Sequence, residues 1–344
     1  LCLINASVPL TPKQKVELIQ SFYKEDPNHT NRLILRVLEK DSYVLPSRFG
    51  RRDRYHQSTI SYDEYFDAIE ALADQCFAFA VKEKDIESMI ALFQQYHIFR
   101  PEFLLHLASL FYQESFDADS LARLNYHLRK KKFNILRWKI EEDIIYETAF
   151  EDLICKTNTE DIPFRWLFFE YFGCPDERLL PVDGHYIEMD LKTAEIRKEA
   201  VNDIVTRNGL PGIYILLNQM NDSTSWGFFL ATNMDEKNHI SIAEKALESG
   251  KIQITAGILN HSSKETFDGI YEKASMEIRK QLLASMQRKD MEGWLKTEDE
   301  RRALWFGKIM DQYDEGIYKK LLKYYPAGLL YYCHEVVHNS PTTH

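Results

Sequence analysis

The residues with the clearest chemical potential lie near the end of the sequence, in the pentapeptide His334-Glu335-Val336-Val337-His338. On a helix, two histidines four positions apart place both imidazoles on one face, where they can bind the same Zn²⁺ ion. The glutamate between them can then polarise a metal-bound water. The preceding stretch, AGLLYYC, is apolar and favours the helix that this chemistry needs. One alternative for this chain is therefore a zinc-dependent hydrolase with Glu335 as its catalytic residue.

A third potential zinc ligand, His344, follows His338 by six residues, which is the spacing of the extended metzincin pattern HExxHxxGxxH. Metzincins have glycine where this chain has Pro341, because the backbone must turn sharply there. Proline restricts φ to about −65° and does not supply that turn. We therefore expect a plain terminal helix with an exposed tail and no cofactor. Zinc held by His334, His338 and His344 is the alternative.

A run of arginines lies in the segment SRFGRRDRYH, which follows Pro46 and contains Gly50. Both residues disfavour a continuous helix, so we expect a basic loop that contacts a partner surface or phosphate groups. The arginines of this loop are Arg48, Arg51, Arg52 and Arg54. Arg51 and His56 also have the RxxxxH spacing of HEPN ribonucleases, in which both residues act on RNA from a helix. An RNA-binding or HEPN-like module is therefore a third hypothesis.

A second basic cluster, Arg129–Lys132, follows His127 and precedes Phe133 and Trp138. Basic residues interleaved with aromatic ones can grip a nucleic-acid strand. The whole chain, however, has 43 Lys and Arg against 53 Asp and Glu, a net charge of −10, which disfavours general binding to nucleic acid. We expect a solvated turn between helices here, with a nucleic-acid contact as the alternative.

The composition favours helices over sheets. The chain has 19 Tyr, 20 Phe and 5 Trp but only 13 Gly and 11 Pro, too few for the many turns of a β-sandwich or barrel. Its 5 cysteines are scattered without a CxxC pair, which is typical of free thiols in the cytoplasm. The apolar runs are shorter than the roughly 18 residues that span a bilayer, and no signal peptide is evident. We predict a cytoplasmic protein with no membrane association.

Local signals divide the chain into helices. Thr11 before Pro12 predicts a capped helix start, and Asp85 and Pro101 predict two more. Gly250 predicts a left-handed helix end, as does Gly209. About a dozen helices follow from such signals.

These helices predict an all-α fold, a degenerate α-solenoid of stacked helical hairpins similar to HEAT or tetratricopeptide arrays. At most one short hairpin or strand pair is expected, near residues 184–191, with a new helix after Thr193. We expect a helical-repeat half at 1–173, an irregular connector at 174–192 and a second helical-repeat half at 193–344.

Several blocks of the chain resemble the C-terminal helical region of large bacterial proteins that carry an N-terminal effector or STAND-type NTPase module. They are Leu10–Lys40 with its Asp26-Pro27 corner, Trp166-Leu167-Phe168, and the block in which Arg197, Ala200, Ile204 and Gly209 precede a small-residue turn at Gly227. The resemblance implies a ligand-sensing or scaffolding segment of an antiphage-type protein, with catalysis elsewhere in a longer chain. It carries over no catalytic residue.

Together these features predict a non-enzymatic helical-repeat scaffold or sensor that binds a protein partner. Nucleic acid is a possible second partner through the basic loops. Tyrosine is common among interface anchors, so Tyr331 and Tyr332 join the Arg48–Arg54 loop as expected partner-binding residues.

Overall fold

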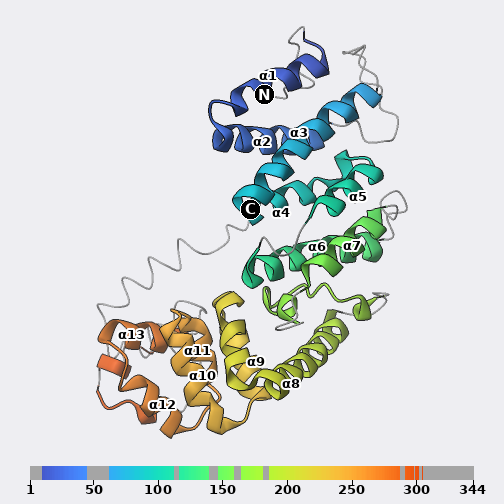
Figure 1. Ribbon diagram of the computed structural model, residues 1–344. Coiled ribbons are helices and arrows are strands. Elements are labelled where there is room, and N and C mark those ends of the chain that lie inside the picture. The colour runs from blue at the N-terminus through green and yellow to red at the C-terminus, as the bar shows by residue number, and fades with distance from the viewer. Residues whose placement is uncertain are drawn as a thin grey trace, which may run out of the picture. The chain divides into compact units, whose positions relative to one another are not determined.

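The described secondary structure is entirely helical (Figure 1). The computed structural model describes residues 10–44, 62–111, 116–138, 146–158, 164–180, 186–286, 291–297, 299–301 and 304. Across these ranges there are 14 α-helices and three short 3₁₀-helices, and no strand. The predicted all-α fold is confirmed.

The chain divides into two compact units, one formed by Leu1–Phe169 with Gly173–Ala194 and the other by Glu170–Phe172 with Glu195–His344. The first unit contains α1 (Pro12–Tyr23), α2 (Pro27–Val44), α3 (Tyr62–Glu83), α4 (Ile86–Gln94), η1 (Tyr96–Ile98), α5 (Pro101–Leu110), α6 (Ala118–Trp138), α7 (Glu147–Thr157), η4 (Arg165–Phe168) and η5 (Glu177–Leu179). Helix α8 (Tyr186–Gln219) begins in the first unit and continues in the second. The second unit then contains α9 (Thr224–Asn233), α10 (Glu236–Glu248), α11 (Ile252–Leu259), α12 (Lys264–Tyr271), α13 (Met276–Ser285) and α14 (Met291–Trp294).

Helices within each unit pack mainly on their neighbours along the chain. In the first unit, α2 contacts α1, α3 and α4, while α4 contacts α6 and α5 contacts α7. In the second unit, α10 contacts α11 and α12, while α11 contacts α9 and α13. Stacked hairpins produce such contacts between a helix and the next or next-but-one helix. The superhelical arrangement predicted from the sequence stays a prediction.

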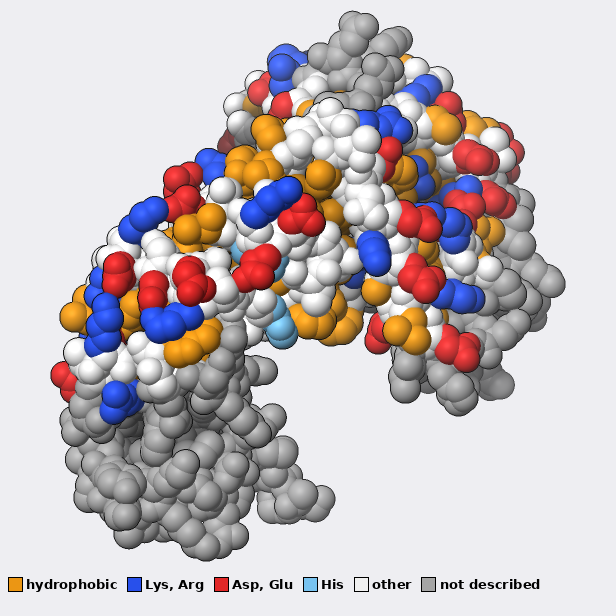
Figure 2. Space-filling model, turned by 90° about the horizontal axis from the view of Figure 1, so that it is seen from below, with side chains coloured by type: hydrophobic (Ala, Val, Ile, Leu, Met, Phe, Trp, Pro, Cys, Tyr) orange, Lys and Arg blue, Asp and Glu red, His pale blue; other side chains and the backbone are white. Residues whose placement is uncertain are grey.

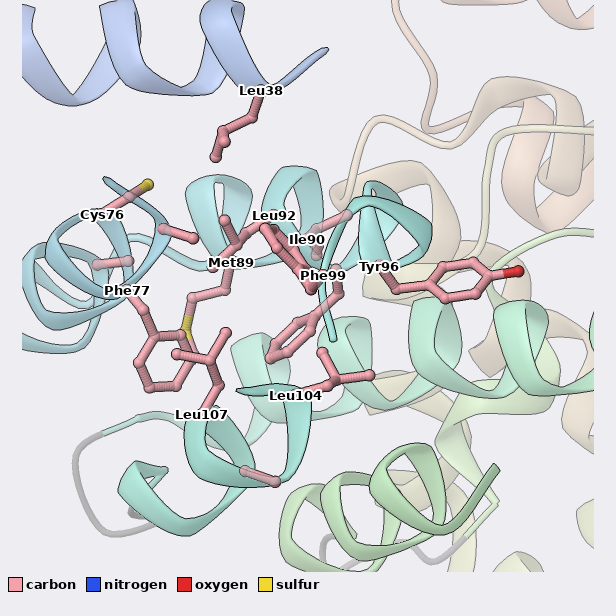
Figure 3. Packing of buried hydrophobic residues seen from close by; sticks show 14 of the residues in the cluster. Leu38, Cys76, Phe77, Met89, Ile90, Leu92, Tyr96, Phe99, Leu104 and Leu107 are labelled. Carbon is pink, nitrogen blue, oxygen red and sulfur yellow. The ribbon is translucent and has the colours of Figure 1, made fainter. Parts of the chain in front are cut away.

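The core of the first unit is a continuous cluster of apolar side chains (Figure 3). Each helix contributes residues at helical spacing, such as Met89 and Leu92 from α4 and Leu104 and Leu107 from α5, all fully buried. Burying a side chain of this size contributes about 1.5–3 kcal/mol. Many of the aromatic residues serve this core rather than a site.

The predicted helix starts are confirmed. Thr11 and Gln14 form a reciprocal capping box, in which the Gln14 amide donates to the Thr11 hydroxyl and the Gln14 side chain accepts from the Thr11 amide. Asp85 caps α4 by accepting from the backbone amide of Ser88 at 3.1 Å. Pro101 occupies the first turn of α5, where a proline costs no helical hydrogen bond.

The predicted left-handed glycines are confirmed, with φ of +62° at Gly209 and +71° at Gly250. Gly250 follows the end of α10, whereas Gly209 ends the first of two helical segments that meet at a kink within α8. The short strand that the sequence allowed near residues 184–191 is absent from the described residues there, because α8 is helical from Tyr186. The helix start expected after Thr193 is therefore wrong. The physical reason is visible in the burial pattern along the helix. Thr193, Ile196 and Ala200 are buried and Met189 is half-buried, at intervals of three or four residues, whereas Leu191 is 63% exposed.

The small-residue turn expected at Gly227 is also wrong, because this glycine lies within α9. There α9 crosses α11 at Gly257, and the two backbones touch. A Cβ atom at Gly227 would lie 2.1 Å from the carbonyl oxygen of Ile254 and 2.7 Å from the Cα of Gly257. Gly227 is therefore required for the close approach of α9 and α11 and not for a turn.

Candidate functional site

Three groups of residues singled out from the sequence lie outside the described part of the chain. These are the potential zinc site His334, Glu335, His338 and His344, the basic loop Arg48, Arg51, Arg52 and Arg54, and the tyrosines Tyr331 and Tyr332. Across the ranges that are described, no group of three or more His, Cys, Asp or Glu side chains is arranged to hold a metal ion. No described helix is both long enough and apolar enough to cross a membrane.

The second basic cluster, Arg129–Lys132, lies in the middle of α6, so the expected turn between helices is wrong. Asp117 accepts a hydrogen bond from the Ser120 amide at 2.8 Å at the start of this helix, which then runs for 21 residues. With 3.6 residues per turn, the four basic side chains point in different directions. They therefore have different surroundings.

Two of the four basic side chains are internal. Arg129 lies with its guanidinium carbon 4.3 Å from the ring centroid of Trp166 and donates from Nε to the Asn125 side-chain oxygen at 2.8 Å. Burial lowers the pKa of Arg129, and nearby carboxylates, chiefly Glu177, oppose that shift. The contacts fix η4 and the C-terminal half of α6 to each other.

Lys132 is the second internal cation, with a side chain only 7% exposed. Its Nζ lies 2.9 Å from a carboxylate oxygen of Glu177, 3.7 Å from Glu151 and 3.8 Å from Glu147. Burial lowers the pKa of Lys132, but the hydrogen bond and charge of Glu177 and the charges of the other two carboxylates raise it overall. Lys132 thereby joins α6, α7 and η5 and has a structural role.

The other two, Lys130 and Lys131, line a groove of about 230 Å³ between α4 and α6. Its apolar residues are Ile90, Phe93, Leu124 and Leu128, and its polar residues are Gln94, His127, Lys130, Lys131 and Asn134. The apolar residues are at most 5% exposed, so the accessible surface of the groove is formed mainly by the polar residues, among them the two lysines.

Aromatic rings lie beneath both lysines of the groove. The Lys130 Nζ is 5.5 Å from the ring centroid of Tyr126, and the Lys131 Nζ is 5.8 Å from that of Tyr96. Lys131 also donates to the main-chain oxygen of Gln94 at 3.4 Å, at the end of α4. These contacts favour conformations that keep the ammonium groups near the groove.

One ion pair joins the two helices beside the groove. The guanidinium of Arg123, one turn before His127 on α6, lies 2.8 Å from the carboxylate of Glu87 on α4. Both side chains are at least half exposed, so the pair adds little stability.

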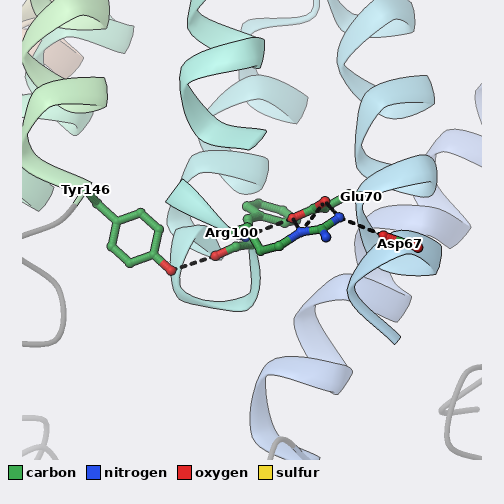
Figure 4. A network of polar contacts seen from close by, with 5 residues as sticks. Asp67, Glu70, Arg100 and Tyr146 are labelled. Atoms are coloured by element: carbon green, nitrogen blue, oxygen red, sulfur yellow. Dashed lines mark hydrogen bonds and ion pairs between the residues drawn. The ribbon is translucent and has the colours of Figure 1, made fainter. Parts of the chain in front are cut away.

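Another polar cluster ties α5 to α3 (Figure 4). The guanidinium of Arg100 donates to Asp67 at 2.7 Å and to both carboxylate oxygens of Glu70, at 3.1 and 3.0 Å from Nε. Hydrogen bonds to Glu70 and then Asp67 raise the pKa of Arg100. Tyr146 donates to the main-chain oxygen of Phe99 at 2.6 Å, next to this cluster. These hydrogen bonds from the Arg100 guanidinium all reach carboxylates of α3, so the cluster holds the start of α5 against α3.

Sequence reasoning missed the groove, because half of it comes from α4, which carries no unusual residues. The signal available was His127 preceding Lys130 and Lys131 by about one turn on a single helix. Comparisons of this chain with protein-family models, with functionally characterised proteins and with solved structures find no match. The groove is the candidate site on its geometry alone.

Proposed function

We propose that this chain is a non-enzymatic helical-repeat module that binds a protein partner through the groove between α4 and α6. The observation that carries the proposal is the groove itself, in which polar side chains of both helices lie over apolar residues that are at most 5% exposed. Interfaces between separately folded proteins contain many polar, hydrated contacts, which a groove bordered by Gln94, Lys131 and Asn134 can supply. Small-molecule sites usually have 300–1,000 Å³ of volume, more than this groove offers.

The charge of the chain favours a protein partner over a nucleic acid. Figure 2 shows acidic and basic side chains interspersed on the described residues in view, without a broad basic face. Nucleic-acid affinity depends on many phosphate contacts made by Lys and Arg, and the chain carries a net charge of −10. A sensing role in an antiphage-type protein rests on the sequence resemblance alone and stays a prediction.

A selection from a random peptide library displayed on phage tests the proposal without presuming the partner's charge. The bait is the full 344-residue chain. Asn134→Trp places a bulky side chain at the groove, and Gln20→Trp adds the same side chain to the exposed face of α1. We expect enriched peptides whose binding falls at least about tenfold with N134W and is unchanged with Q20W. Circular dichroism melts confirm that both variants fold.

Two results would overturn the proposal. One is that no peptide is enriched. The other is that every enriched peptide binds N134W as tightly as the unmodified chain.

A further inference from the structure

We infer that Glu170–Phe172 is a releasable strap: Arg197 of α8 holds it to the second unit, and its release exposes Cys174 of the first unit while both units stay folded. The inference is independent of the groove between α4 and α6. It follows from the path of the chain, from the contacts of Arg197 and from the small amount of strap surface that is buried.

The chain enters the second unit at the strap and then returns to the first. Residues up to Phe169 belong to the first unit, Glu170–Phe172 to the second, and Gly173–Ala194 again to the first. The strap lies between η4 and η5 and is itself not helical. Because it is held by the second unit and continuous at both ends with the first, a change in one unit can reach the other through the chain itself.

Arg197 holds the strap by its main chain and by one aromatic ring. It donates from Nη1 to the main-chain oxygen of Tyr171 and from Nη2 to that of Glu170, both at 2.7 Å. Its guanidinium carbon lies 5.4 Å from the ring centroid of Tyr171 and 4.7 Å from that of Trp226. Arg197 is only 3% exposed, so these hydrogen bonds are shielded from water and correspondingly strong. The strap is therefore held mainly at Tyr171.

The surface of the strap on either side of Tyr171 does little to retain it. Phe172 is 71% exposed and Glu170 is also exposed, so release removes little apolar surface from the interior. Gly173 follows with a φ of +78°, a conformation that glycine adopts without strain. The next residue, Cys174, is 4% exposed. Release at Tyr171 frees the backbone that leads directly to Cys174, whose thiol reports the opening.

The test measures the rate at which a thiol reagent labels each cysteine of the full 344-residue chain, resolved by peptide mapping. In the unmodified chain the exposed Cys155 should react fast, and the buried Cys174 and Cys76 slowly. Arg197→Met removes the charge and the donors but keeps an unbranched side chain. We expect it to raise the labelling rate of Cys174 at least about tenfold, because loss of two shielded hydrogen bonds increases the open population. Cys76 should stay protected.

Arg279 provides a matched control, because it makes contacts of the same chemistry elsewhere in the second unit. It donates from Nε to the main-chain oxygen of Tyr271 at 2.8 Å and from Nη2 to that of Glu272 at 2.7 Å. Its guanidinium carbon lies 5.1 Å from the ring centroid of Tyr271. R279M should leave the labelling rate of Cys174 unchanged. In R197M, hydrogen exchange of the peptides covering α10 and α11 should stay slow, because the second unit stays folded.

Two glycines provide a second matched pair, which tests the strap even if R197M does not fold. Gly173 and Gly250 have φ of +78° and +71°, and a Cβ at either would meet no atom of the described residues within 4 Å. Alanine is therefore similarly strained at both positions, but only Gly173 adjoins the strap. We expect Gly173→Ala to raise the labelling rate of Cys174 about fivefold and Gly250→Ala to leave it unchanged.

The inference is overturned if R197M leaves the labelling rate of Cys174 unchanged, if R279M raises it equally, or if G173A and G250A have the same effect. It is also overturned if Cys174 becomes reactive only when α10 and α11 lose their slow hydrogen exchange. In that case Arg197 stabilises the second unit as a whole, and the strap has no separate opening.

Discussion

The contact between α9 and α11 allows the sharpest test of the fold. Gly227 and Gly257 face each other where these helices cross, and a Cβ at either position would strike backbone atoms of the other helix. For Gly227→Ala the nearest atom is the Ile254 carbonyl oxygen at 2.1 Å. Backbone atoms cannot rotate away as a side chain can, so the two helices must move apart.

The magnitude follows from two opposing effects. Replacing glycine by alanine inside a helix favours the helix by about 1 kcal/mol. Overpacking a close contact typically costs 1–3 kcal/mol, and here the contact is short of ordinary van der Waals distance by more than ~1 Å. Moving the helices apart also weakens the packing of Trp226 and Leu230, both almost fully buried. We expect a net loss of about 2 kcal/mol in the free energy of unfolding of the second unit.

Urea unfolding followed by circular dichroism, with hydrogen exchange of the peptides covering α9 and α11, measures this loss. With a typical urea m-value of roughly 2 kcal/mol per molar, the midpoint should fall by about 1 M. Gly269→Ala is the matched control, because its Cβ would meet only the Cδ1 end of the Ile240 side chain, at 2.9 Å. The reasoning is refuted if G227A and G269A unfold at the same midpoint and exchange α9 amides at the same rate.

Three further predictions follow from other parts of the chain. Arg100→Ala should lower the free energy of unfolding by about 2 kcal/mol, because it leaves the Glu70 carboxylate, 8% exposed, without its guanidinium; an unchanged urea midpoint would contradict this. In the folded protein a thiol reagent at mildly alkaline pH should modify the exposed Cys155 and spare Cys76 until the chain unfolds, and equal rates would contradict the burial. Burial raises the pKa of Cys76 from 9.0 to about 12, so its contribution to stability is complete below pH 9 and is lost as the pH rises toward 12. Metal analysis of the purified chain should find no stoichiometric zinc, and zinc that is lost on His334→Ala would contradict a purely scaffolding role and favour the hydrolase alternative.

The helix boundaries could be predicted because the interactions that set them are local. Thr11 caps a helix through Gln14, three residues later, and Asp85 does so through Ser88. Gly250 adopts its positive φ because the helix ends there, whatever packs around it. The all-α class follows from such signals and from the scarcity of glycine and proline.

The errors arose where a local pattern was compatible with two structures. The apolar residues at 184–191 fit a strand, but α8 is helical from Tyr186, and Met189 lies half-buried one turn before the buried Thr193. Four consecutive basic residues fit a solvated turn, yet Lys132 is buried because glutamates of α7 and η5 surround its ammonium group. Such partners are distant in sequence and become evident only after the helices pack.

The candidate groove lay beyond prediction for the same reason. Phe93 and Lys130 come from helices that are separated by η1 and α5, and neither helix alone forms a concave surface. Burial of Ile90 and Leu124 could be predicted from helical periodicity. That their helices leave room between them depends on the sizes of all the side chains at the contact.

Several basic side chains of this acidic chain donate to main-chain carbonyl groups at the ends of other helices, and such contacts give these side chains a structural role. The examples are Arg279 Nε to Tyr271 O at 2.8 Å, Lys251 Nζ to Met220 O at 2.8 Å and Lys156 Nζ to Ala108 O at 2.7 Å. Each neutralises the partial negative charge of a helix C-terminus. Lys131 makes the same contact to Gln94 O, but at 3.4 Å, longer than a well-formed hydrogen bond. This contact therefore stabilises its helix end less than the other three do.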